Sequence, residues 1–172
     1  MASSPAEFCR LNGNGYNNDR FDFKSYHITP LADFKLKAKI LSKEHYSLGR
    51  ESDLSPVDLA LGWQNMSDES VLKNIDISQS GRWYRWHVAQ FPIPRNEIET
   101  QSANMHMVPA NEKVADAIAN AKQGEIIELS GYLIRVDAED GFYWQSSLTR
   151  DDTGAHACEL VYVEQFRVTD NK

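Results

Sequence analysis

The sequence predicts an α+β fold that is mainly β. Three observations support this: several segments alternate apolar and polar residues with the period of a strand, only one longer segment has the spacing of an amphipathic helix, and turns rich in Asp and Gly separate the last segments. With 172 residues, 41% of them hydrophobic, the chain suits one domain with a single core. We expect a flexible tail over residues 1–20 and a single globular domain over residues 21–168.

The first strand is predicted over residues 34–46. Its apolar residues, beginning with Phe34 and Leu36, alternate with Lys35, Lys37 and Lys39. This pattern is typical of a strand with one face in water. The lysines would also protect a free edge of the sheet from pairing with another chain.

Two short helices are expected next. Ser55 and Pro56 resemble the cap and first residue of a helix that Gly62 would end. Asp68 and Glu69 lie where acidic residues favour the start of a second helix.

A further strand is predicted over residues 82–91, ended by the prolines that follow Phe91. A period of two places Tyr84 and Trp86 on one face. The other face carries Trp83, Arg85 and His87. Shorter strands are expected over residues 75–77 and 104–108.

The clearest helix follows Asn111, which is a typical cap. Val114, Ile118 and Ala121 make one apolar stripe, and Gly124 lies where a helix-terminating glycine is expected.

Three strands complete the chain, over residues 126–136, 142–149 and 156–167, and we expect them to form an antiparallel meander. The order of strands, short helices, strand, helix and meander resembles the OB-fold, a small five-stranded barrel with a helix between its third and fourth strands. An OB-like small barrel is therefore expected, with a bend at Gly131.

The net charge is −7, so duplex DNA and anionic membranes would be repelled by the average field. No apolar run approaches the roughly 20 residues that span a bilayer, which predicts no membrane insertion. The first residues lack the apolar segment of a secretory signal. The chain as written is expected to be cytoplasmic, and extracytoplasmic if a leader or anchor has been removed.

Three segments carry candidate ligand-binding side chains. Trp83 with Arg82, Arg85 and His87 could stack on bases or sugars or hold an anion, although aromatic residues of this strand could simply pack in the core. Trp144 lies beside polar residues and Arg150, which could line a groove or face water. His106 lies between Met105 and Met107 and could titrate or bind a metal. Alternation places the two methionines on the opposite face, which favours instead a buried histidine bonded to the backbone.

Two cysteines, Cys9 and Cys158, form no CxxC or Cys/His cluster, so neither a metal nor a cofactor is expected. His156 and Cys158 could form a nucleophile pair, or a turn followed by a buried thiol.

These features favour a non-catalytic binding or interaction module whose ligand is a small molecule, a saccharide or a protein segment. One alternative is a small hydrolase that uses His106 or the His156/Cys158 pair. Another is a structural subunit of a homodimer.

Several strings resemble a family of uncharacterised bacterial proteins. They lie at residues 26–31, 54–63, 82–84, 102–110, 152–154 and 157–159, and the similarity extends from Phe21 to Glu164. Members of that family often follow an N-terminal membrane-spanning segment, where this chain has a polar tail. The resemblance implies no activity and gives no residue a role.

Overall fold

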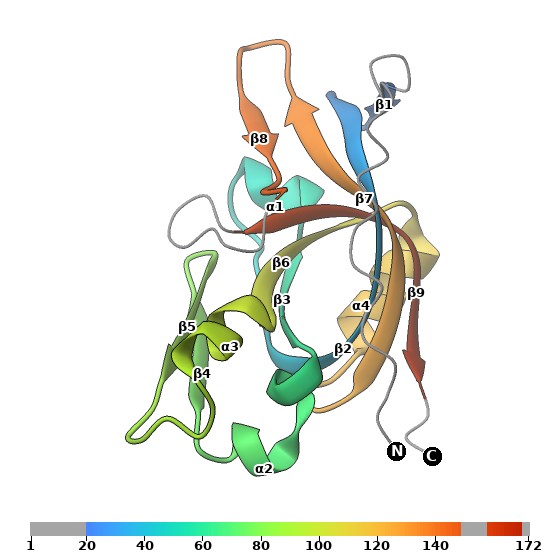
Figure 1. Cartoon of the computed structure of the whole chain (residues 1–172). Coiled ribbons are helices and arrows are strands. Elements are labelled where there is room, and N and C mark those ends of the chain that lie inside the picture. Colours follow the sequence, from blue (N-terminus) through green and yellow to red (C-terminus); the bar gives the residue numbers. More distant parts are fainter. Residues whose placement is uncertain (1–19, 149–157, 170–172) are drawn as a thin grey trace.

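A computed structural model describes residues 20–148 and 158–169 of the chain, and most of them lie in strands (Figure 1). The α+β, mainly β prediction is therefore confirmed. The predicted tail lies almost entirely outside the described residues. Within the described ranges, no helix is long and apolar enough to cross a membrane.

The first long strand extends well beyond its predicted start. β2 (Tyr26–His45) follows β1 (Phe21–Phe23) through a tight hairpin. The predicted alternation is present, with Phe34 and Leu36 in the core cluster. Lys39 departs from it, because its side chain is buried in an ion pair with Glu69.

The helix predicted to start at Ser55 is wrong. A short helix, α1 (Arg50–Leu54), ends before that residue, and β3 (Val57–Gly62) is a strand buried along its whole length. Its neighbours β2 and β6 pair with both of its edges. A strand covered on both faces shows little polar alternation, and tertiary pairing overrides the local helix-start signals.

A small subdomain follows β3, at the lower left of Figure 1. It consists of η2 (Gln64–Ser67), α2 (Glu69–Leu72), β4 (Asp76–Ser80), β5 (Trp83–His87) and α3 (Arg95–Thr100). Asp68 caps α2, as its side chain accepts a hydrogen bond from the Ser70 N–H at 2.8 Å. Strands β4 and β5 pair only with each other among the described residues. Tyr84 and Trp86 pack against the buried Ala60 and Met66, so this face of β5 belongs to a core.

The rest of the chain is β6 (Ser102–Pro109), α4 (Glu112–Asn120), β7 (Ile126–Asp137), β8 (Tyr143–Gln145) and β9 (Glu159–Thr169). The predicted meander is wrong, because β9 lies beside β7 and not beside β8. β2 pairs along one edge of β7, so β8 and β9 share the other edge at its two ends. The register shifts between Ser130 and Gly131, where a bend was predicted.

The strand pairings return to their starting point. β2 pairs with β3, β3 with β6, β6 in parallel with β9, β9 with β7, and β7 with β2. The pairings are uneven, short between β6 and β9 and long between β2 and β7. Alternate side chains from these five strands form the main core, against which Val114, Ile118 and Ala121 of the α4 stripe pack.

Gly124 does not end α4. The helix ends at Asn120 with Ala121 as its cap. Gly124 lies in the following turn with φ +89°, and its N–H donates to the Ile40 oxygen at 2.8 Å. Its left-handed conformation therefore serves the connection to β7.

Asn111 caps α4 as predicted, since its side-chain oxygen accepts a hydrogen bond from the Val114 N–H at 3.0 Å. Asn111→Ala should lower the free energy of unfolding by about 1 kcal/mol. Urea unfolding followed by circular dichroism measures this. Asn120→Ala, at the exposed end of the same helix, is the matched control and should change stability by less than about 0.5 kcal/mol. Equal losses in the two variants would contradict the capping role.

Candidate functional site

The candidate site is a cavity of about 550 Å³ between α1, β5, β6, β8 and the residue that precedes β9. Four residues predicted to bind a ligand line it: Arg82, Trp83, His106 and Trp144. The remaining lining residues are Glu51, Tyr143, Gln145, Ser146, Ser147 and Cys158. The tertiary structure thus brings together residues of the three candidate segments, around Trp83, His106 and Trp144, which are distant in the sequence.

His106 reaches the cavity because of the alternation along β6. Met105 and Met107 belong to the main core, while Asn104 and His106 belong to the opposite face. The methionines and the histidine cannot share a metal ion across the strand. Among residues 20–148 and 158–169, no group of three or more His, Cys, Asp or Glu side chains is placed to hold one.

Asp58 is the buried anchor of the site. It lies directly opposite His106 in the β3–β6 pairing and has a relative exposure of 0%. Its Oδ1 accepts a hydrogen bond from Arg82 Nη1 at 2.7 Å and lies 2.9 Å from His106 Nδ1. The latter contact is an ion-pair distance without the alignment of a hydrogen bond. Asp58 was missed because its segment was predicted as a helix; an acid within an otherwise apolar run was the available signal.

Arg82 is fixed from several directions at the tip of the β4–β5 hairpin, where it has φ +69°. Its backbone N–H donates to the Tyr46 hydroxyl at 2.9 Å, and its carbonyl accepts from Asn104 Nδ2 at 3.1 Å. The guanidinium lies 4.0 Å from the Tyr46 ring centre and 5.7 Å from that of Trp144. Arg82 therefore joins the hairpin to the main sheet.

Aromatic rings form the walls and rim of the cavity. The Trp144 ring packs on His106 with 4.9 Å between ring centres. Trp83 is 40% exposed and Tyr143 is 62% exposed. Such rings offer flat apolar surfaces to a ligand.

Polar side chains follow Trp144 along the same wall. The Ser146 hydroxyl donates to the Ser147 oxygen at 2.8 Å and accepts from the Leu160 N–H at 3.0 Å. These bonds attach the end of β8 to β9 and fix the wall. Trp144, Gln145, Ser146 and Ser147 line the cavity, whereas Arg150, which was expected beside them, lies outside the described residues.

The other predicted site residues lie elsewhere. Arg85 and His87 are exposed on β5 and line neither cavity described here, and Arg85 Nη1 donates to Ser80 Oγ at 2.8 Å. Arg150 and His156 lie outside the described residues.

Cys158 lines the cavity beside His106. Burial raises the pKa of its thiol to about 11, with a smaller contribution in the same direction from the Glu159 and Asp58 carboxylates. The thiol is therefore protonated at neutral pH, and its nucleophilicity is low.

Alkylation with iodoacetamide should follow this pKa. Relative to the ordinary value of 9.0, the folded protein should hold about a hundredfold less thiolate at pH 8. The Cys9→Ser variant leaves one thiol to follow by mass spectrometry. We expect the folded protein to react about a hundredfold more slowly than the same protein in urea. Equal alkylation rates in the folded and unfolded states would contradict the raised pKa.

The free energy of unfolding should also fall as the pH rises from 9 towards 11, because the unfolded chain loses the thiol proton first.

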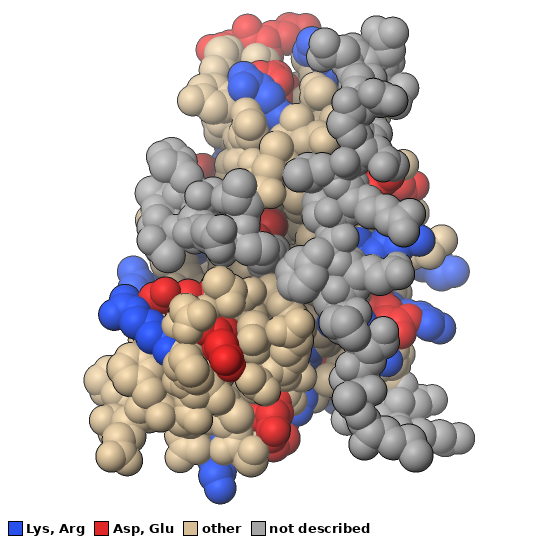
Figure 2. Space-filling view, in the orientation of Figure 1, with Lys and Arg blue, Asp and Glu red and all other residues tan. Residues whose placement is uncertain are grey.

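Charges on the face shown in Figure 2 are mixed. Among the described residues, basic and acidic side chains are interspersed, with no broad basic surface on this face.

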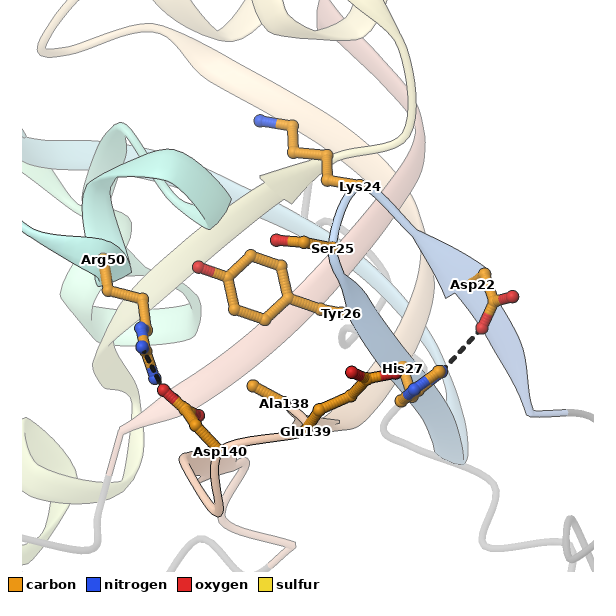
Figure 3. A pocket seen from close by; sticks show the side chains of 9 residues that line it. All are labelled: Asp22, Lys24, Ser25, Tyr26, His27, Arg50, Ala138, Glu139 and Asp140. Atoms are coloured by element: carbon orange, nitrogen blue, oxygen red, sulfur yellow. Dashed lines mark hydrogen bonds and ion pairs between the residues drawn. The ribbon is translucent and has the colours of Figure 1, made fainter.

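A second hollow of about 460 Å³ lies between β1, β2, α1 and the β7–β8 turn (Figure 3). Two ion pairs lie in its lining: Asp22 with His27 at 2.6 Å, and Arg50 with both oxygens of Asp140. The hydrogen bond from Arg50 is the main cause of the lowered pKa of the Asp140 carboxyl. The Asp22–His27 pair lies within the β1–β2 hairpin, and the Arg50–Asp140 pair joins α1 to the β7–β8 turn, so both pairs have a structural explanation.

Comparison with known proteins adds no relative: no protein-family model matches the chain, and no curated protein matches it at a significant level.

Proposed function

We propose that the protein is a non-catalytic binding module built on an OB-like barrel, which takes a small polar ligand in the cavity between β5, β6 and β8. The barrel is supported by the order of the pairings. As in an OB-fold, the helix α4 lies between the third and fourth strands of the ring, β6 and β7. The uneven ring would be a partly open form of that barrel.

The position of the cavity supports a binding role. It lies on the outer face of β6, the third strand of the ring, at His106, whose partner on β3, the second strand, is Asp58. It is next to α1 and β8, which belong to the connections after the first and fourth strands. OB-folds bind oligonucleotides and oligosaccharides on this face between these loops. A shared fold does not by itself establish a shared function, so the binding role must be supported by the residues of the cavity.

One observation supports it: three aromatic rings, those of Trp83, Tyr143 and Trp144, line a cavity of about 550 Å³ together with polar side chains. Small-molecule sites typically have volumes of roughly 300–1,000 Å³ and combine aromatic walls with a few oriented polar groups. A saccharide-like ring fits this chemistry because its apolar face can stack on an indole while its hydroxyl groups bind the polar wall. A protein segment with an aromatic side chain is the other ligand class to test.

The test is a titration followed through the indole N–H resonances of the four tryptophans. Methyl β-glucoside, N-acetylglucosamine, adenosine and a tryptophan-containing tripeptide are the probes. We expect at least one to shift Trp83 and Trp144 while Trp63, which is buried elsewhere, stays unchanged. Trp83→Ala should weaken that binding about tenfold, since base or ring stacking contributes roughly 1–3 kcal/mol.

Phe91→Ala is the matched control, because Phe91 is an exposed aromatic residue outside the cavity. It should leave the affinity unchanged. If no probe shifts Trp83 or Trp144, or if Trp83→Ala binds as well as the parent, the proposed site is wrong. A concentration-dependent mass in sedimentation would instead favour the homodimer.

A hydrolase is the second candidate because His106 and Cys158 both line the cavity, and the buried Asp58 lies 2.9 Å from His106 Nδ1 on the neighbouring strand. His106 would take the thiol proton as Cys158 attacks an ester carbonyl, the alcohol would leave with that proton, and water would then hydrolyse the thioester to regenerate the thiol. The raised thiol pKa opposes this role. Turnover of p-nitrophenyl acetate that is lost in both Cys158→Ala and His106→Gln would establish it; under our proposal, the parent and these variants show the same background rate.

A further inference from the structure

We infer that the cavity selects uncharged, hydroxyl-rich rings, such as a neutral pyranose, and rejects their carboxylate- or phosphate-bearing counterparts. The inference rests on the proposed binding function and names the ligand class of that site. It follows from the charges around the cavity, taken one at a time.

The Arg82 guanidinium is already committed to a carboxylate. Asp58 is fully buried and receives the 2.7 Å hydrogen bond from Arg82 Nη1, and the Arg82 side chain is only 17% exposed. An anionic ligand that took this guanidinium would leave the Asp58 charge buried without its arginine. Such an uncompensated charge is strongly unfavourable, so Arg82 is a positioning residue here and not an anion clamp.

The second guanidinium near the cavity is committed as well. Arg135 lies 4.6 Å from the ring centre of Tyr143. Its Nε donates to both carboxylate oxygens of Asp137, at 3.1 and 3.0 Å, and its Nη1 donates to Gln145 Oε1 at 3.1 Å. This cation is therefore balanced by an acid of its own strand.

Among the residues that the structure describes, the remaining fixed charge of the lining is negative. Among the described lining residues, Arg82 and Glu51 carry the permanent charges, and Glu51 is exposed at the rim. With Arg82 balanced by Asp58, an entering anion meets the unbalanced Glu51 carboxylate. A neutral ring meets no such repulsion and can use the exposed faces of Trp83 and Tyr143.

Matched pairs of sugars test this selection. Methyl β-glucoside is compared with methyl β-glucuronide, and N-acetylglucosamine with its 6-phosphate, by titration at low and moderate salt with the Trp83 and Trp144 indole resonances as the readout. We expect at least one neutral member to bind about tenfold or more tightly than its anionic partner, with the larger difference at low salt.

The Glu51→Gln variant probes the cause. It should reduce the difference in affinity between the two sugars of a pair severalfold. The anionic sugar should bind more tightly, and the affinity for the neutral sugar should stay unchanged. Asp116→Asn, the same charge change on an exposed position of α4, should leave the difference as it is.

The outcomes separate the two proposals. An anionic sugar that binds as well as its neutral partner overturns the selection and leaves the binding module standing. If neither sugar pair binds but adenosine or the tripeptide does, the selection for neutral sugars is likewise overturned and the binding module is kept. If no probe of any class shifts the two indoles, the proposed function itself fails.

Discussion

Replacing Asp58 with alanine should destabilise the protein by about 3 kcal/mol or more. The carboxylate accepts hydrogen bonds from Arg82 on the hairpin and from Asn104 on β6, and it lies against His106. Without it, a largely buried guanidinium loses its counterion between two packed layers. Removing one member of a buried ion pair costs roughly 3–5 kcal/mol, and the partial exposure of Arg82 places this case at the lower end.

Urea unfolding, followed by tryptophan fluorescence and far-UV circular dichroism, measures the effect. Asp116→Ala, an exposed acid on α4, is the control and should change stability by less than about 0.5 kcal/mol. Because Asp58 and Arg82 are in contact, the double variant Asp58→Ala/Arg82→Ala should lose less than the sum of the two single variants, by about 1–3 kcal/mol. Additive losses would show that the two side chains do not stabilise the fold as a pair.

Gly131→Ala should have a comparable effect for a steric reason. A Cβ at this position would lie 1.8 Å from the Tyr162 oxygen and 2.9 Å from the Tyr162 carbonyl carbon. Both atoms are backbone, so no side chain can move aside, and β7 would have to separate from β9 at the shift in their pairing. We expect a loss of about 3 kcal/mol, at the upper end of the usual range of roughly 1–3 kcal/mol for overpacking, or a failure to fold.

Gly141→Ala is the matched control. Gly141 has φ +90° and open space around its missing Cβ, so its substitution costs only the backbone strain of about 1 kcal/mol. Thermal unfolding of both variants separates close contact from strain. If the two substitutions have equal effects, the close approach of β7 and β9 at Gly131 is wrong.

Only part of the cavity could be predicted. The alternation along β5 predicted Arg82 and Trp83 as ligand-binding residues, and the residue types of later segments predicted His106 and Trp144. Asp58 was not predicted because Ser55 and Pro56 before it favour the start of a helix. Tyr143 was not predicted because nothing in its local sequence distinguishes a cavity rim from a strand end. Their roles depend on β3 lying beside β6 and on β8 lying near the hairpin tip.

The sequence by itself determined the features that depend on neighbouring residues. The alternation along residues 34–40, the cap at Asn111 and the stripe of α4 were all predictable, because each reflects a local period or a local hydrogen bond. Only the tertiary structure decided that Val57–Gly62 is a strand. It also decided that β9 pairs with β7 and β6, and that β8 pairs with the C-terminal end of β7. The physical reason is that strand pairing joins residues far apart in the chain, so the partner's position, and not the local pattern, fixes which edge is filled and which side chains meet at the cavity.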